Sequence, residues 1–373
     1  MLLRCRSNSH RPSGRTALAA AAIAILALSP ALTLSPAGLI AADRSADHSE
    51  GLRENPPDVW ILRNATVVIN PDVSLPNASI VIRQGKIDSV GTDIAIPDDA
   101  RQIDLTGRTV YPGFLDAYAT AATGNERLAG TAAYWNSQIT PQKSIATQFH
   151  GTSNTSTLRK QGFVAQLLVP ADGVIKGTSA LVSLQGGSAN DRILRADVAQ
   201  HLELTAPRRS RTDYPGSPMG AVALARQAVY DAQWYRDAVA AAAADPALPK
   251  PERNDALAAL RPILDGTMPV VVRTSNEQFI LRAEHFAAEF GLNLIICGSG
   301  NEYRRLKEIA AAQRPLIIPL AFPDAPNVST ADAAREVTLE SLMHWDLAPE
   351  NPGRVEAAGI RFALCTHRLA STG

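Results

Sequence analysis

Hydrophobic positions along this chain change their spacing near residue 107. Before that point, three short runs carry alternating or β-branched apolar residues, with turn residues at Asn70-Pro71, Gln84-Gly85 and Thr106-Gly107. Alternation with a period of two predicts strands that bury one face. We expect a small β unit that packs on another part of the protein, because so small a sheet is marginally stable alone.

After residue 107 the apolar residues form continuous runs. They predict eight strands, at 109–115, 163–169, 179–184, 200–204, 268–273, 292–297, 315–320 and 360–365. Helical patterns occupy most of the intervals and are clearest at 218–244, 252–264, 276–290 and 301–313. Continuous apolar strands that alternate with helices are typical of parallel sheets covered on both faces. The pattern predicts an α/β fold, a closed (β/α)8 TIM-like barrel.

Local signals predict where some of these helices begin and end. Ser217 can cap the helix at 218–244, Pro218 suits its first turn, and Asp245-Pro246 ends it. We expect the aromatic residues of this helix to pack on the barrel; the alternative is that they face a ligand. Residues 344–354 predict a helix end and a loop that turns at Asn351-Pro352.

The first 42 residues have the order of a secretory signal peptide. Four arginines precede an uncharged apolar run at 17–28, and small residues follow it. We expect export to the periplasm or secretion, with no stable membrane insertion after cleavage. An uncleaved membrane anchor is the alternative, although Pro30 and Pro36 interrupt the span and the apolar part is shorter than the roughly 20 residues a membrane helix needs. Residues 43–57 read as a polar linker.

The end of the chain suggests an incomplete barrel. Gly373 follows the last predicted strand by eight residues, which leaves no room for a closing helix. We therefore expect the barrel to be incomplete at the C-terminus, and a truncated reading frame is one interpretation of the whole sequence.

The charge of the chain limits the kinds of molecule that we expect it to bind. Lys plus Arg and Asp plus Glu both number 36, and no basic stripe appears, which argues against nucleic acid as a partner. The sequence does not determine the oligomeric state.

Once Cys5 leaves with the leader, Cys297 and Cys365 remain. They lie on strands that we expect to be second neighbours, about 9–10 Å apart, so we predict buried free thiols and not a disulfide. A soft-metal site with His367 is the alternative.

One segment resembles a known family. Its residues are Gly107, Val110, Pro112, Gly113, Phe114, Leu115 and Asp116. This segment is similar to the entry motif of the amidohydrolase superfamily, with the imidazolonepropionase-like branch as the closest resemblance, and the likeness runs over nearly all of 59–370. It implies a β-sandwich subdomain at 58–107, a barrel at 108–373, and hydrolysis of carbon–nitrogen bonds other than peptide bonds.

The resemblance also implies a binuclear zinc centre, but this chain lacks the ligands. Tyr118 and Thr120 replace the paired histidines after the first barrel strand, Arg273 replaces the histidine of the fifth, and Cys297 ends the sixth. Thr366-His367 stands where the family has Thr-Asp. A cation such as Arg273 would repel a metal ion. We therefore predict no metal cofactor.

The remaining polar residues at the strand ends still make a candidate site. Asp116, Arg273 and His367 could perform acid–base catalysis without metal. The alternative is a structural network in which Arg273 pairs with Asp116. Tyr118, Thr120 and Cys297 complete the predicted substrate-binding set.

Two functions follow. The first is an exported amidohydrolase-like hydrolase that lacks the usual metal centre; the second is a catalytically inactive small-molecule-binding or scaffold protein on the same barrel. In either case Arg273 favours an anionic ligand. His201 lies in a weak strand pattern and predicts a half-buried histidine with its hydrogen bonds satisfied.

Overall fold

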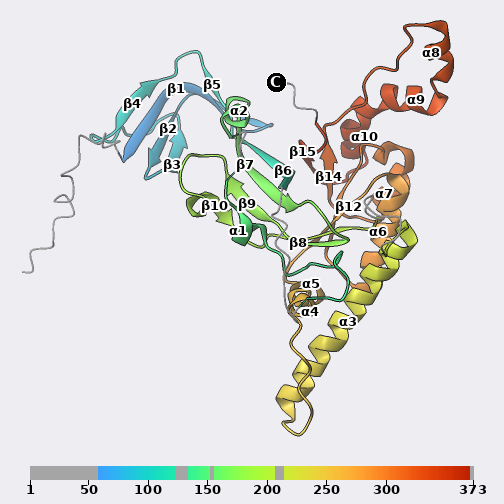
Figure 1. Ribbon diagram of the computed structural model, residues 1–373. Helices are drawn as coiled ribbons and strands as arrows, with labels where there is room; N and C mark the ends of the chain where they lie inside the picture. Colours follow the sequence, from blue (N-terminus) through green and yellow to red (C-terminus); the bar gives the residue numbers. More distant parts are fainter. Residues whose placement is uncertain (1–57, 122–132, 152–154, 206–213, 370–373) are drawn as a thin grey trace, which may run out of the picture. The chain divides into compact units, whose positions relative to one another are not determined.

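The computed structural model describes residues 58–121, 133–151, 155–205 and 214–369 (Figure 1). The described residues fall into two compact units, one within 58–65 and 76–107 and one within 66–75 and 108–369. The predicted signal peptide and linker lie outside the described residues. No helix among the described residues is long and apolar enough to cross a membrane.

The predicted N-terminal strands are confirmed, and they belong to one five-stranded sheet. Its strands are β1 (Val59–Asn70), β2 (Val73–Arg83), β3 (Lys86–Gly91), β4 (Arg101–Asp104) and β5 (Thr109–Val110). The order is β3-β2-β1-β4, with β5 also beside β1. Gln84 and Gly85 both have positive φ, 51° and 72°, as a tight hairpin turn requires. Two facing sheets, which a sandwich needs, are not found in this described segment.

A four-stranded sheet begins the second unit. Its strands are β6 (Phe114–Ala121), β7 (Phe163–Pro170), β9 (Ala180–Ser183) and β10 (Ile193–Arg195), in the order β10-β9-β7-β6. β6 and β7 are parallel, whereas β9 runs antiparallel to β7.

The third sheet has six strands. They are β8 (Ile175–Thr178), β11 (Gln200–Glu203), β12 (Val270–Arg273), β13 (Leu294–Cys297), β14 (Leu316–Pro319) and β15 (Phe362–Cys365), in the order β15-β14-β13-β12-β11-β8. β11 to β15 are parallel, and β8 runs antiparallel to β11.

The backbone hydrogen bonds of the described residues therefore do not form the predicted closed barrel of eight parallel strands. The predicted strand 109–115 is divided, because β5 pairs with β1 in the N-terminal sheet and only its last residues belong to β6. The other predicted barrel strands lie in two open sheets, and the predicted strand 179–184 is antiparallel to its neighbour. The antiparallel pairing of β7 and β9 is explained by the length of the connection between them. Only residues 171–179 separate β7 from β9, and a parallel neighbour needs a crossover of about a dozen residues or more.

The helices agree with the sequence pattern where it is strongest. They are α1 (Ile145–Gln148), α2 (Thr155–Lys160), α3 (Pro218–Ala244), α4 (Asp255–Ala259), α5 (Arg261–Leu264), α6 (Glu277–Phe290), α7 (Leu306–Ala311), α8 (Ala331–Glu336), α9 (Leu339–Leu347) and α10 (Asn351–Ala357), with 3-10 turns η2 (Asn190–Arg192), η3 (Glu302–Arg305) and η4 (Ala348–Glu350). The predicted cap of α3 is confirmed, since the Ser217 hydroxyl accepts the Gly220 N–H at 3.1 Å. The predicted turn at Asn351-Pro352 is wrong: proline fits the first turn of a helix, and α10 begins there.

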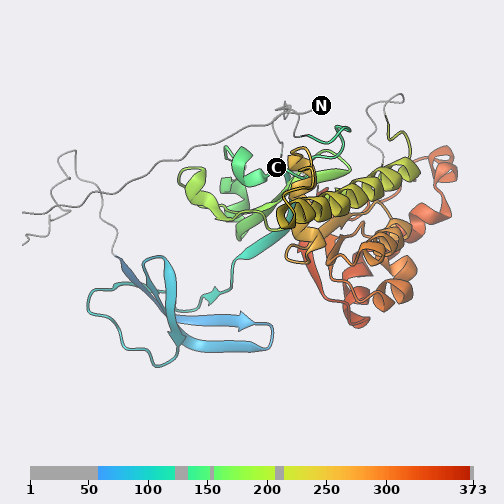
Figure 2. The same cartoon turned by 90° about the horizontal axis from the view of Figure 1, so that it is seen from below.

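The main core lies between the six-stranded sheet and its helices. Side chains such as Val270, Val272, Leu294 and Ile296 alternate along the strands and pack against α3, α6 and their neighbours. These helices, coloured yellow to orange, lie together on one side of the second unit (Figure 2). The alternate residues of the same strands, including Val271 and Cys297, point the other way and pack with Tyr118 and Val169 of β6 and β7.

Candidate functional site

A pocket of about 770 Å³ lies where several parallel strands end. Glu203 and Arg273 are the last residues of β11 and β12, and Gly298 and His367 follow the ends of β13 and β15. Polar residues lining the pocket include Glu203, Thr205, Arg273, Thr274, Ser275 and His367. The carboxyl ends of parallel strands share one edge of a sheet, so residues far apart in the sequence meet here.

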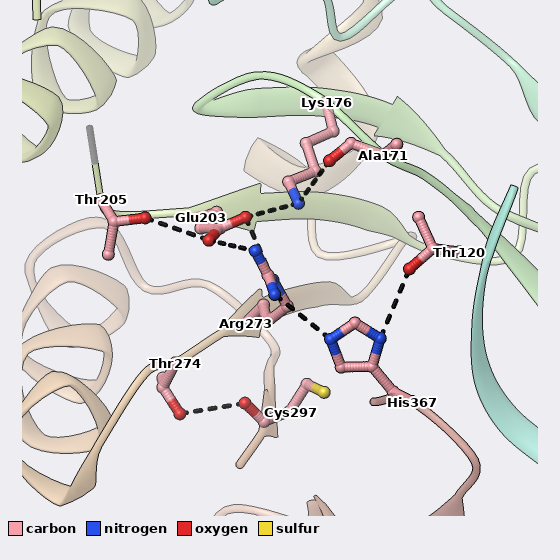
Figure 3. Close-up of polar contacts among 9 residues, drawn as sticks. All are labelled: Thr120, Ala171, Lys176, Glu203, Thr205, Arg273, Thr274, Cys297 and His367. Carbon is pink, nitrogen blue, oxygen red and sulfur yellow. Dashed lines mark hydrogen bonds and ion pairs between the residues drawn. The ribbon is translucent and has the colours of Figure 1, made fainter. Parts of the chain in front are cut away.

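Arg273 is the centre of this site (Figure 3). Its Nε donates to Glu203 Oε2 at 3.1 Å, and its Nη2 forms a second, shorter bond to Glu203 Oε1. Its Nη1 lies 3.2 Å from His367 Nε2. The expected pairing of Arg273 with Asp116 is therefore wrong. The register of the sheet explains the partner, because Glu203 lies directly beside Arg273 on the neighbouring strand.

Glu203 also binds a buried lysine. Lys176 Nζ lies 2.6 Å from Glu203 Oε2 and donates to the Ala171 carbonyl at 3.0 Å. The Lys176 side chain is only 2% exposed. Burial alone would raise the pKa of Glu203, but Lys176 and Arg273 outweigh it and lower that pKa. Glu203 thus stays ionised between two cations.

His367 lies on the other side of Arg273. A guanidinium can only donate, so His367 Nε2 accepts, and Nδ1 carries the proton toward Thr120 Oγ1 at 3.4 Å. Burial and then the charge of Arg273 lower the pKa of His367 to about 4. The imidazole is neutral at pH 7, and its only lone pair is already engaged.

Asp116 does not line this pocket. Its carboxylate is 1% exposed and accepts four hydrogen bonds. The donors are the backbone N–H of Tyr118 at 3.3 Å and of Thr366 at 3.0 Å, the Gln166 amide at 3.0 Å and the Thr366 hydroxyl at 2.6 Å. In this geometry Asp116 joins β6 and β7 to the segment that follows β15.

The predicted substrate-binding residues lie around the pocket without lining it. Tyr118 is 2% exposed, and its ring packs edge-on against His201 and His367 with centroids 5.6 and 5.1 Å apart. Thr120 reaches the site only through His367. The Cys297 carbonyl accepts both the N–H and the hydroxyl of Thr274 at 2.9 Å.

Both described cysteines are buried free thiols, as predicted. Contact with the Cys365 thiol and burial raise the pKa of Cys297. A thiol with a raised pKa is a weak nucleophile at neutral pH, so Cys297 acts as a small apolar side chain in the cluster that it shares with Tyr118.

His201 differs from the sequence expectation. It is 1% exposed, and neither ring nitrogen has a hydrogen-bond partner among the described residues. Burial, followed by the charge of Lys176, lowers its pKa to about 3. The strand pattern around His201 is weak, so the sequence did not indicate that this position is fully buried. In the sheet, His201 lies on the face that carries Val271 and Arg273.

Zinc, which the resemblance implies, does not fit the described residues. Within residues 58–369, apart from the gaps named above, no three His, Cys, Asp or Glu side chains are placed to hold a metal ion. At the strand ends, positive groups already surround the carboxylate that could serve as a ligand, since Lys176 and Arg273 both bind Glu203.

Sequence reasoning missed Lys176 and Glu203. Glu203 carried a usable signal, because it ends a predicted strand next to the strand that ends at Arg273. Lys176 had none, since the sequence pattern did not distinguish the short strand β8.

Comparison with known proteins bears on the fold. No protein-family model and no curated protein matches the chain. Among solved structures, it is similar to an amidohydrolase from Thermotoga maritima MSB8, with 18% identity, a TM-score of 0.65, and coverage of 84% of this chain and 79% of that one. A prolidase complexed with N-methylphosphonate-L-proline covers the same shares at 14% identity, but its TM-score of 0.40 carries no weight. The chain therefore has a mixed α/β fold shared with the Thermotoga amidohydrolase.

Proposed function

We propose that this protein binds a small organic anion, a carboxylate, in the pocket around Arg273. The observation that carries the proposal is the state of the guanidinium. Three of its five N–H groups have partners in Glu203 and His367, and it lines an open pocket with its side chain 31% exposed. The two remaining N–H groups can pair with a carboxylate.

The local charge supports an anion. Glu203 holds one negative charge between two positive ones, Lys176 and Arg273. Asp172 and Arg368 line the same pocket and add one charge of each sign, so the charged groups around the pocket keep an excess of positive charge. Hydroxyl groups of Thr205, Thr274 and Ser275 line the same pocket. A partly buried cation beside polar hydrogen-bonding groups favours carboxylates over neutral ligands.

Paired ligands test this proposal. NMR titration with carboxylates and with the matching neutral amides should show binding of the acids only. Arg273→Met should weaken that binding by about 10–100-fold, since hydrogen bonds to charged groups contribute about 1.5–3 kcal/mol. Arg226→Met is the matched control, because Arg226 is an arginine bound to a glutamate on the exposed surface. Equal binding of acids and amides, or none, would contradict the proposal.

A second candidate is hydrolysis of a carbon–nitrogen bond in such a ligand. It is favoured by the fold shared with an amidohydrolase and by the pocket's place at the strand ends. Hydrolysis would need a different binding mode, in which the ligand takes the Arg273 Nη1–H group from His367 and so releases the His367 Nε2 lone pair to accept a proton from water. A pKa near 4 makes that base weak, which is why binding is the first proposal. Product formation from N-acyl amino acids by stoichiometric enzyme separates the two.

We propose in addition that the two larger sheets derive from a (β/α)8 barrel. Parallel strands β11 to β15 with helices on one face, and the hydrogen bonds from Thr366 to Asp116, support it. The basic and apolar leader supports export of the protein.

A further inference from the structure

One wall of the pocket offers an apolar contact that an anion alone does not use. Phe279 lies in the first turn of α6, where its backbone N–H donates to Asn276 Oδ1 at 3.1 Å. The Arg282 guanidinium lies over its ring, 4.6 Å from the centroid. These contacts hold an aromatic side chain at the edge of the pocket, and Pro218, the first residue of α3, lines the same pocket.

The volume of the pocket also favours a ligand that carries an apolar group. A pocket of about 770 Å³ is in the range of sites that enclose drug-sized ligands, about 300–1,000 Å³. A simple carboxylate on Arg273 would leave most of that space filled with water. An apolar group attached to it would displace water from Phe279 and Pro218, which is favourable in proportion to the apolar area buried.

We infer that the ligand is an aromatic carboxylate, whose acid group pairs with Arg273 and whose ring packs on Phe279. A ring is favoured over an aliphatic chain because it can pack edge-to-face on Phe279. The inference rests on the proposed function, since it assumes an anion on Arg273.

A ligand series tests the ring separately from the acid. NMR titrations with acetate, cyclohexylacetate, phenylacetate and 3-phenylpropionate should rank the two aromatic acids as the tightest, at least tenfold tighter than acetate. Phe279→Ala should remove that gain and leave acetate binding within twofold. Phe322→Ala is the control, because Phe322 is an exposed phenylalanine that does not line this pocket. Nuclear Overhauser contacts between ligand ring protons and Phe279 give a readout independent of affinity.

The possible outcomes separate failure of the inference from failure of the proposed anion binding. If acetate binds and the aromatic acids bind no better, or if Phe279→Ala leaves their advantage unchanged, the inference fails and anion binding stands. If cyclohexylacetate equals phenylacetate, the ring preference fails. If no acid binds, both proposals fail together.

Discussion

At the scale of single residues, this protein is marked by ionisable groups held away from water. Lys176 and Arg273 both form ion pairs with Glu203, so the burial of these charges is compensated. His201 is different, because its ring is buried and both nitrogens lack a partner among the described residues. An unpaired buried polar group costs about 1–3 kcal/mol.

We therefore expect His201→Leu to stabilise the protein. The free energy of unfolding at pH 7 should rise by about 1–3 kcal/mol, because an apolar side chain removes the unpaired nitrogens. Urea denaturation measures this. His285→Leu, at an exposed position on α6, should change it by less than about 0.5 kcal/mol. A loss of stability in His201→Leu would show that the ring binds an ordered water or a ligand.

The same residue predicts a pH dependence. The pKa of His201 is about 3 in the folded protein, below the 6.5 of an ordinary histidine, so the unfolded state binds more protons between these values. The free energy of unfolding should therefore reach a plateau above pH 6.5 and decrease as the pH falls toward 3. His201→Leu should flatten that decline, and an unchanged pH profile would contradict the assignment.

At the scale of elements, the turn after β13 depends on one buried carboxylate. Glu302 is 0% exposed. Its Oε1 accepts the N–H groups of Ser299 and Gly300 at 2.7 and 3.0 Å, and its Oε2 accepts the Asn351 amide at 2.5 Å. A Cβ on Gly298 would lie 2.1 Å from the same Oε1, which explains why glycine stands at this pocket-lining position.

Glu302→Ala should lower the free energy of unfolding by about 2–4 kcal/mol, since it leaves two backbone donors and an amide buried without partners. Glu308→Ala is the control in the neighbouring α7, where the side chain is 48% exposed and its ion pair contributes little. Urea denaturation of both variants measures the difference. Equal stabilities would mean that the turn does not depend on Glu302.

At the scale of the whole molecule, positive side chains gather around a carboxylate at the ends of the strands. Lys176 and Arg273 both bind Glu203 at the strand ends. We expect the purified protein to contain less than about 0.1 equivalent of zinc by elemental analysis, and a chelator to leave the melting temperature unchanged, because a cation at that position repels a metal ion. One or two equivalents that survive dialysis, with a chelator-sensitive melting temperature, would overturn this view.

Much of the fold could be predicted from the sequence because the signals are local. Alternating or continuous apolar runs marked the strands, and Ser217 and Pro218 marked the start of α3. The meeting of Arg273 with His367 followed from strand order alone, since parallel strands end at one edge.

Pairing and burial were decided only by the tertiary structure. Whether a strand runs parallel or antiparallel depends on which strand lies beside it, and the apolar pattern of β8 and β9 does not identify that neighbour. Likewise, the sequence determined that charged groups stand at the strand ends, but Arg273 pairs with Glu203 and not with Asp116 because sheet register selects the partner. Electrostatic partners depend on distances across the fold, which composition and spacing do not contain.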